Sequence, residues 1–391
     1  MRALVQTARR TEEARRAVAD LDKARGLGLE ILRRAGIEVG GDQPCDIAVH
    51  DDRFWARVLA TRELGLGESY QDGWWDANQL DEFIAHVQTL DLRSLVRPGP
   101  GLLMHIARAR AANRQTVRRS RRNAGVHYDI GNDLYERMLD KRMIYSCGYW
   151  RRAEDLDQAQ EDKLELICRK LQLEPGMRLL DIGCGWGGFA RFAATEHGVT
   201  VTGATPAREQ ARWAREACAG LPVEIRECDY RDLEGSFDRI VSIGMMEHVG
   251  PRNLKTFFGR CGRLLSGDGI MLHHTIGSLE SKHHTDPWFD KYIFPGGVVP
   301  SLAQITSACE HDWIIEDVQN FGPYYDRTLM AWHRKVTEAW TDLTGYDERV
   351  RRTWDYYLLS SAGSFRARAL QLWQIVFTRS RRRSEVYHRP D

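Results

Sequence analysis

The stretch Leu179-Leu180-Asp181-Ile182-Gly183-Cys184-Gly185-Trp186-Gly187-Gly188 decides the fold of this 391-residue chain. A short apolar run ends in an acidic residue and is followed at once by closely spaced glycines. This pattern is typical of a buried strand that turns tightly into a helix, where glycines let the backbone approach a bound ligand. A plain corner between a strand and a helix would tolerate one or two glycines, but hardly four beside a buried acid.

The glycines of this stretch also satisfy the G-x-G-x-x-G spacing of dinucleotide-binding proteins. Two features argue against a dinucleotide. Asp181 stands at the tip of the strand, where its carboxylate would repel a pyrophosphate but attract the cationic amino group of a bound amino acid. The next predicted strand, 199–205, runs into Ala204-Thr205-Pro206, where a dinucleotide site requires an acid. The D-x-G-x-G pattern is typical of methyltransferases that use S-adenosylmethionine (SAM).

The composition is that of a folded globular protein. Hydrophobic residues make up 42% of the chain and the formal net charge is +1, which excludes an intrinsically disordered chain. A chain of this length can bury one large core and a second, smaller one. No apolar run approaches the length that crosses a bilayer, and no signal-peptide hydrophobic segment stands at the N-terminus, so we expect a cytoplasmic protein.

The cysteine and histidine patterns argue against a metal site. The eight cysteines are scattered without a C-x-x-C, which indicates a reducing compartment and neither a zinc ribbon nor a disulfide framework. The pairs His273-His274 and His283-His284 lack the spacing of metal ligands. We therefore expect no bound metal ion.

Apolar runs and helical patterns alternate through the second half of the chain. This rhythm predicts an α/β fold with a doubly wound, Rossmann-like parallel sheet that binds ligands at the carboxyl ends of its strands. The predicted strands are 179–182, 199–205, 223–228, 237–243 and 269–275, and the predicted helices are 159–173, one from Gly188, 207–219 and 253–265. The late segments 313–318 and 328–333 are predicted to close the sheet as antiparallel strands, and residues 348 to about 380 to form a long helix.

Changes in composition divide the chain into three parts. Residues 1–93 are predicted to form a smaller N-terminal α+β domain that faces lipid, with about the first 20 residues mobile. Residues 94–122 form a basic linker, and residues 123–391 the catalytic domain. In the first domain, Ile47-Ala48-Val49-His50 predicts a short strand, and Trp74-Trp75 predicts either part of a small core or a surface that meets lipid.

The basic linker holds a strong local charge asymmetry. After an apolar start, it carries seven arginines with no acid among them: Arg108, Arg110, Arg114, Arg118, Arg119, Arg121 and Arg122. Such a block can be a solvated linker, or it can bind nucleic acid or an anionic membrane. Because no base-reading motif stands nearby and the segment starts with apolar residues, the membrane is favoured over nucleic acid.

Polar side chains follow several predicted strands, where a sheet of this kind opens its cleft. Glu247 and His248 follow the strand 237–243, His273 and His274 stand near the end of the strand 269–275, Tyr325 lies in a later loop, and Cys147 stands between aromatic residues. Each has an ordinary structural alternative. Glu247 can be a carboxylate at a helix N-terminus, and Cys147 a small core residue.

Taken together, these stretches resemble the family of cyclopropane-fatty-acyl-phospholipid synthases and mycolic acid cyclopropane synthases. The resemblance covers nearly everything after residue 40, and the first thirty, arginine-rich residues fall outside it. The matching blocks, in order along the chain, are 64–75, 127–133, 145–147, 180–188, 237–250, 274–277, 292–296 and 320–332.

The resemblance implies transfer of a methylene group from SAM to the cis double bond of an acyl chain in a membrane phospholipid. The alkene attacks the methyl group, a carbocation results, and a base removes a proton from the new methyl as the ring closes. The family uses a bound bicarbonate ion as this base. By match, the bicarbonate is held by the side chains of Glu247, His274 and Tyr325 and by backbone groups at Cys147 and Ile276.

The resemblance also assigns residues to the cofactor. Asp181, Gly183 and Gly185 are expected along the methionine part of SAM, with Tyr145 and Ser146 near its carboxylate. The ribose is expected at Thr205 and Gln210, and the adenine between Asp229 and Tyr230. The family further suggests a homodimer that associates peripherally with the inner face of the cytoplasmic membrane.

Three other functions remain open at this point. The same carbocation can lose a neighbouring proton or capture water, which gives a methyl-branched or hydroxylated chain. A small-molecule N-methyltransferase can share this fold, although a lipid-facing N-terminal domain would be unnecessary for a soluble amine. A non-catalytic module that binds membranes is supported only by the arginine segment.

Overall fold

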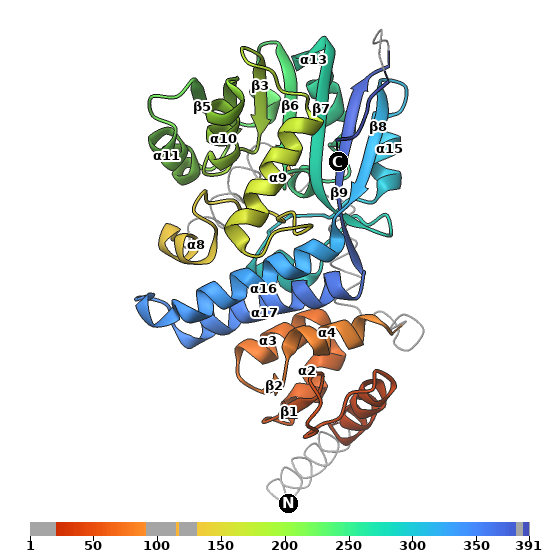
Figure 1. Ribbon diagram of the computed structural model, residues 1–391. Helices are drawn as coiled ribbons and strands as arrows, with labels where there is room; N and C mark the ends of the chain where they lie inside the picture. The colour runs from red at the N-terminus through yellow and green to blue at the C-terminus, as the bar shows by residue number, and fades with distance from the viewer. Residues whose placement is uncertain (1–20, 91–114, 117–130, 381–385, 391) are drawn as a thin grey trace, which may run out of the picture. The chain divides into compact units, whose positions relative to one another are not determined.

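The computed structural model describes residues 21–90, 115–116, 131–380 and 386–390 (Figure 1). The chain divides into two compact units. The smaller unit comprises Met1–His105, Asp286–Trp288 and Tyr346–Ala367, and the larger unit comprises Ile106–Thr285, Phe289–Gly345 and Arg368–Asp391. The predictions of a mobile first 20 residues and of a basic segment rich in arginine lie outside the described residues, apart from Gln115 and Thr116.

The larger unit is built on a seven-stranded sheet in the order β5-β4-β3-β6-β7-β9-β8. Its strands are β3 (Arg178–Ile182), β4 (Thr200–Thr205), β5 (Val223–Glu227), β6 (Phe237–Ile243), β7 (Leu265–Ser278), β8 (Trp313–Asn320) and β9 (Leu370–Arg379). The first five strands in this order run parallel, while β9 is antiparallel to both β7 and β8. The predicted doubly wound sheet is therefore confirmed, with all five of its parallel strands where the sequence pattern placed them.

Helices cover both faces of this sheet (Figure 1). On one face, apolar side chains of α9 (Leu156–Lys170) and α10 (Gly188–His197) pack against Leu179, Val241 and Leu272 of the strands. On the other face, α13 (Leu254–Leu264) and α15 (Leu302–Cys309) pack against residues that alternate with these. Because successive side chains of a strand point to opposite faces, one apolar run serves both cores.

The remaining helices of the larger unit connect or flank the sheet. They are α8 (Asn132–Met138), α11 (Arg208–Ala217), α12 (Met246–Val249) and α16 (Gly322–Glu338), and α14 (Pro287–Tyr292) begins within the smaller unit. Among the described residues, no helix has both the length and the apolar character that crossing a bilayer requires.

Two predictions about the end of the chain are wrong. Residues 328–333 do not form a strand but lie inside α16, where Thr328, Leu329 and Trp332 are buried at helical spacing. The predicted helix from 348 to about 380 ends at Arg366 as α17 (Glu348–Arg366), and β9 follows. Since β9 lies between two strands and is buried on both faces, its mostly apolar sequence does not alternate, and periodicity cannot distinguish it from a buried helix.

The smaller unit combines a two-stranded sheet with helices. Besides a helix over residues 21–34, it contains β1 (Ile47–Val49), antiparallel β2 (Trp75–Ala77), α2 (Arg53–Thr61), α3 (Glu63–Gln71), α4 (Leu80–Gln88) and α17. The short strand predicted at 47–50 is confirmed. The inclusion of α17 differs from the predicted span of 123–391 for the catalytic domain. Arg352 of α17 explains it, because its guanidinium donates to the carbonyl of Tyr70 at 2.5 Å and to Asp76 at 2.7 Å.

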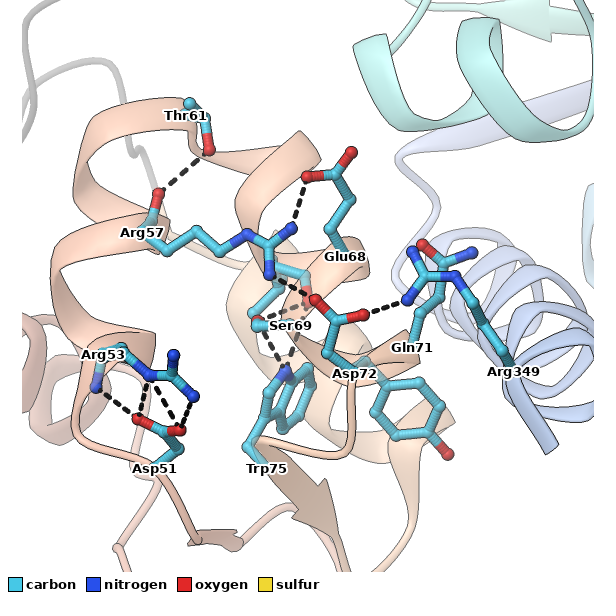
Figure 2. Close-up of polar contacts among 12 residues, drawn as sticks. Asp51, Arg53, Arg57, Thr61, Glu68, Ser69, Gln71, Asp72, Trp75 and Arg349 are labelled. Atoms are coloured by element: carbon cyan, nitrogen blue, oxygen red, sulfur yellow. Dashed lines mark hydrogen bonds and ion pairs between the residues drawn. The ribbon is translucent and has the colours of Figure 1, made fainter.

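A polar network holds the helices of the smaller unit together (Figure 2). The guanidinium of Arg57 lies between Glu68, at 2.7 Å, and Asp72, at 2.6 Å, and Asp72 also binds Arg349 of α17. The indole N–H of Trp75 donates to the Ser69 hydroxyl at 3.1 Å, and Trp75 is fully buried. Of the two alternatives for Trp74-Trp75, the structure therefore places Trp75 in the core.

Candidate active site

A cavity opens at the carboxyl ends of β3, β4 and β6, where a doubly wound sheet binds its ligands. All nine residues that the sequence assigns to the cofactor line it, from segments far apart in the chain: Tyr145, Ser146, Asp181, Gly183, Gly185, Thr205, Gln210, Asp229 and Tyr230. The tertiary fold thus brings this predicted set together in one place.

The glycine turn after β3 has the conformation and the close contacts that only glycine allows. Gly183 has a φ of +87°, and a Cβ atom there would lie 2.9 Å from the side chain of Met245. A Cβ on Gly188, at the start of α10, would lie 2.3 Å from the backbone oxygen of Arg142. The glycines therefore serve both the left-handed turn and the packing of the helix against its neighbours.

Asp181 lies near the end of β3 and is 1% exposed. Within the described part of the chain, its Oδ2 has no hydrogen-bond partner. Burial raises the pKa of this carboxyl to about 7, and the positive charge of Lys163 opposes the rise. A buried carboxylate with one unpartnered oxygen facing a cavity is suited to a cationic ligand group, because a buried acceptor without a partner is costly.

The other end of the cavity is organised by hydrogen bonds among its own side chains. The hydroxyl of Thr205, at the end of β4, donates to the amide oxygen of Gln210 at 3.0 Å. Asp229 forms an ion pair with Arg231, whose Nε lies 2.6 Å from Oδ1 and whose Nη2 lies 2.8 Å from Oδ2. These contacts fix the orientation of the side-chain amide of Gln210 and of the carboxylate of Asp229.

Gln115, in the predicted basic linker, is buried beside this end of the cavity. Its side-chain amide donates to the carbonyl of Gly296 at 2.5 Å, and its own carbonyl accepts from Arg231 at 3.1 Å. Phe294 and Pro295, just before Gly296, line the cavity. Gln115 is therefore bound to residues that border the cavity.

A second group of buried polar atoms is centred on Glu247 in α12. The backbone N–H of Ile276, on β7, donates to Glu247 Oε1 at 2.6 Å, whereas Oε2 has no partner among the described residues. Burial raises the pKa of Glu247 to about 7. Glu247 lies two residues after Met245 and directly before His248, and both of these residues line the cavity, so Glu247 is close to the cavity along the chain.

His274 also lies on β7, two residues before Ile276, and is buried and neutral. The amide nitrogen of Gln374 on β9 lies 3.3 Å from Nδ1, and because an amide nitrogen only donates, Nδ1 accepts and Nε2 carries the hydrogen. In the part of the chain that the structure describes, Nε2 has no partner. Burial, with the charges of Lys163 and Lys170, lowers the pKa of His274 well below its ordinary value.

The other predicted catalytic residues are also buried. Cys147 is fully buried, its thiol donates to the carbonyl of Gly148 at 3.2 Å, and burial raises its pKa to about 12. Thr328 of α16 contacts the sulfur at 3.9 Å. Tyr325, one turn earlier on α16, is 8% exposed and packs its ring against Trp332. Of the five predicted catalytic residues, Glu247 and Ile276 are joined by a hydrogen bond, and none of the five lines the cavity.

Three polar residues at the cavity are not among the predicted site residues, although His248 was noted at a strand end. Lys163 and His248 line the cavity, and Arg231 holds Asp229. Burial lowers the pKa of His248 to about 4, so its imidazole is neutral, and its ring lies 5.8 Å from that of Phe294. A signal for Lys163 was available, because lysines at 163 and 170 fall on the same helical stripe as Ala159 and Ile167.

The chain matches the family model described as mycolic acid cyclopropane synthetase over residues 115–375. It is 50% identical over 351 residues to the cyclopropane-fatty-acyl-phospholipid synthase of Escherichia coli K12, covering 90% of this chain and 92% of that protein. It is 31% identical to the tuberculostearic acid methyltransferase UfaA1 of Mycobacterium tuberculosis, covering 90% and 88%. The crystal structure of the mycolic acid cyclopropane synthase CmaA1, complexed with SAH and CTAB, is similar with a TM-score of 0.61 and 31% identity, covering 66% of this chain and 97% of that one.

Proposed function

The chain belongs to the mycolic acid cyclopropane synthetase family of SAM-dependent methyltransferases, and on this premise we propose that it forms cyclopropane rings in the acyl chains of phospholipids. It would transfer a methylene group from SAM to the cis double bond of an unsaturated chain. The observation that carries this proposal is Glu247, a buried carboxylate held on one oxygen by Ile276, with the other oxygen unpartnered among the described residues.

The cavity residues suit SAM. The carboxylate of Asp181 can accept hydrogen bonds from the amino group of the methionine part, and the glycine turn leaves room for that part to approach the backbone. We assign Tyr145 and Ser146 to the carboxylate end, Thr205 and Gln210 to the ribose, and Asp229 and Tyr230 to the adenine. SAM, when bound, supplies an electrophilic methyl group.

The unpartnered atoms of the second group suit a small anion that also has a hydroxyl. Oε2 of Glu247 is an acceptor for that hydroxyl, and the Nε2 hydrogen of His274 is a donor for a negative oxygen. Bicarbonate has both features, and when bound it supplies the general base. Tyr325 and the backbone at Cys147 would complete the site. We assign Ile276 to holding Glu247, because its N–H already donates there.

The electrostatics of the site fit a reaction through a carbocation. Glu247 would accept a hydrogen bond from the hydroxyl group of the anion, so that a negative oxygen of the anion faces the methyl group that must lose a proton. His274 remains neutral, because burial opposes its protonation, and so adds no positive charge beside the cation. The thiol of Cys147 remains protonated and is not a nucleophile.

The substrate resides in a bilayer, so we propose that the enzyme docks on anionic membranes at the inner face of the cytoplasmic membrane and acts there as a homodimer. The arginine segment is our candidate for this contact. Its attraction to anionic lipid would be on the order of 1 kcal/mol per basic residue near the surface.

Lipid analysis tests the proposal. The full chain is incubated with SAM and vesicles of an unsaturated phospholipid, and the fatty acids are examined for one added carbon and for its position. We expect a ring. A methyl branch would show that the enzyme is a fatty-acyl methyltransferase that does not close the ring. A hydroxyl group would show that it is a hydroxylating enzyme. Methylation of a soluble amine, without any change to lipid, would exclude the lipid substrate.

A further inference from the structure

A fully buried lysine on α9, Lys163, forms a hydrogen bond with Ser146 at the cofactor cavity. The ammonium of Lys163 is 0% exposed, lines the cavity and donates to the hydroxyl of Ser146 at 2.9 Å. One turn earlier on the same helix, the side-chain amide of Gln160 donates to the carbonyl of Ser146 at 2.8 Å. Helix α9 thus holds Ser146 at two atoms, and the ammonium supplies only one of its three hydrogens to that residue.

The charged and titratable groups that face Lys163 are Asp140, Cys147 and Asp181, together with His274 of β7, which is buried and neutral. Asp140 accepts backbone hydrogen bonds from Arg142, at 3.1 Å, and Ile144, at 2.7 Å. Cys147 carries a protonated thiol. Asp181 differs from both, because it lines the cavity together with Lys163 and, among the described residues, keeps Oδ2 without a partner.

The cavity therefore presents a buried cation and a buried carboxylate to the same ligand. A buried charge is costly unless an opposite charge accompanies it, and a ligand with both an ammonium and a carboxylate group satisfies both side chains. The α-amino acid part of SAM is such a zwitterion. An apolar or singly charged ligand would leave one of the two charges without a partner.

We infer that Lys163 is a further cofactor-binding residue, whose ammonium receives the carboxylate of the methionine part of SAM beside the Ser146 hydroxyl, while Asp181 receives the amino group. The inference rests on the proposed use of SAM. It also gives Ser146 a definite role: since its oxygen accepts from Lys163, its own hydrogen is available to the same carboxylate.

The test compares ligands that differ only in the zwitterion. Binding of SAM, SAH and 5′-methylthioadenosine, which lacks the amino acid part, is measured by calorimetry on the full chain. Lys163→Met should weaken binding of SAM and SAH by about 10- to 100-fold, the range for a hydrogen bond between charged groups. Binding of 5′-methylthioadenosine should not change.

Lys170 provides a matched control. It lies two turns further along α9, is equally buried and pairs with Asp317 at 3.3 Å, but it does not line the cavity. In Lys170→Met, the ratios between the affinities for SAM, SAH and 5′-methylthioadenosine should be the same as in the parent. If Lys163→Met does not fold, Lys163→Gln replaces it, because the amide keeps a donor for Ser146 without the charge.

The outcomes distinguish a wrong role for Lys163 from a wrong cofactor. Equal loss of all three ligands in the Lys163 variant, or no loss of any, overturns the assignment of Lys163 while SAM binding by the parent still stands. If the parent chain binds neither SAM nor SAH, the proposed cofactor itself is wrong and the role of Lys163 falls with it.

Discussion

The backbone N–H of Ile276, on β7, donates a 2.6 Å hydrogen bond to Oε1 of Glu247, in α12. This contact joins a central strand of the sheet to a short helix beside the cofactor cavity. It fixes the carboxylate and leaves Oε2 buried without a partner among the described residues. A buried acceptor of this kind is costly for the folded protein, which is expected where a site is prepared for a ligand.

Glu247→Gln should lower turnover by about 10²- to 10⁴-fold, the usual effect of losing one positioned general base, while SAM binding stays nearly intact. The amide keeps the shape and the contact with Ile276 but no longer accepts a hydrogen bond at both ends. Turnover is measured with bicarbonate supplied. Glu338→Gln, which changes an exposed carboxylate at the end of α16, is the control. Near-parental turnover of the Glu247 variant would remove this residue from the mechanism.

The same variant should change how stability depends on pH. Burial raises the pKa of Glu247 from 4.5 to about 7, so between these values the folded protein keeps a proton that the unfolded chain has released. The free energy of unfolding of the parent therefore falls as pH rises through this window. The stability of Glu247→Gln relative to the parent should increase across it, by at most about 3 kcal/mol. Denaturant titrations at several pH values measure this, and a constant difference would contradict the raised pKa.

The thiol of Cys147 should resist alkylation in the folded protein. Its sulfur is fully buried and its pKa is raised to about 12, so almost no thiolate forms at pH 8, and the thiolate is the reactive species. Mass spectrometry after iodoacetamide treatment should find Cys147 unmodified in the native chain and modified after unfolding in guanidinium. Rapid labelling of the native chain at this site would require an exposed, acidic thiol and would reopen a nucleophilic role.

Gly183→Ala should weaken SAM binding and destabilise the fold. The substitution adds both a left-handed backbone strain and a contact of 2.9 Å with Met245, which together cost on the order of 1–3 kcal/mol. Gly220→Ala is the matched control, because Gly220 has a similar φ of +81° with no atom within 4 Å of the added Cβ. Thermal unfolding and SAM titration should show a larger effect at Gly183. Equal effects would mean that strain alone matters and that the packing against Met245 does not.

Changing five linker arginines to glutamine should weaken binding to anionic vesicles and activity on them, with SAM affinity unchanged. The five are Arg108, Arg110, Arg114, Arg118 and Arg119. Attraction between exposed charges is screened over about 8 Å at physiological salt, so parental binding should fall as salt rises, and binding by the variant should be much less sensitive.

The control for this variant removes five exposed arginines from the larger unit, for the same change in net charge. They are Arg137, Arg178, Arg212, Arg263 and Arg334. Vesicle sedimentation compares the two variants at low salt. If the linker variant binds as tightly as the parent, the segment is a solvated linker. If both variants lose binding equally, only the net charge matters.

Much of the catalytic sheet could be predicted from local sequence. The strands from 179–182 to 269–275 are short apolar runs that alternate with amphipathic helices, and the Asp181 to Gly188 turn marks where the first strand meets its helix. Because parallel strands bring their carboxyl ends to one edge, the residues at the strand ends could be expected near one another, and the structure places all nine residues assigned to the cofactor around one cavity.

The end of the chain could not be predicted in the same way. Strand β9 is buried on both faces between β7 and β8, so its sequence has no alternation to separate it from the preceding α17. The assignment of α17 to the smaller unit depends on partners such as Tyr70, which stands more than 250 residues earlier in the chain than Arg352. Such contacts between distant segments leave no local pattern.

The sequence by itself determined the kind of sheet, the glycine turn and the residue types at the strand ends, because each depends on neighbours within a few positions along the chain. Only the tertiary structure decided which charges are buried and what they face. Lys163 is, by sequence, one lysine of an amphipathic helix, and it becomes a cavity residue because α9 packs that side chain beside Ser146 and Asp181. The cost of burying a charge depends on its three-dimensional surroundings, and those are assembled from segments that the sequence keeps apart.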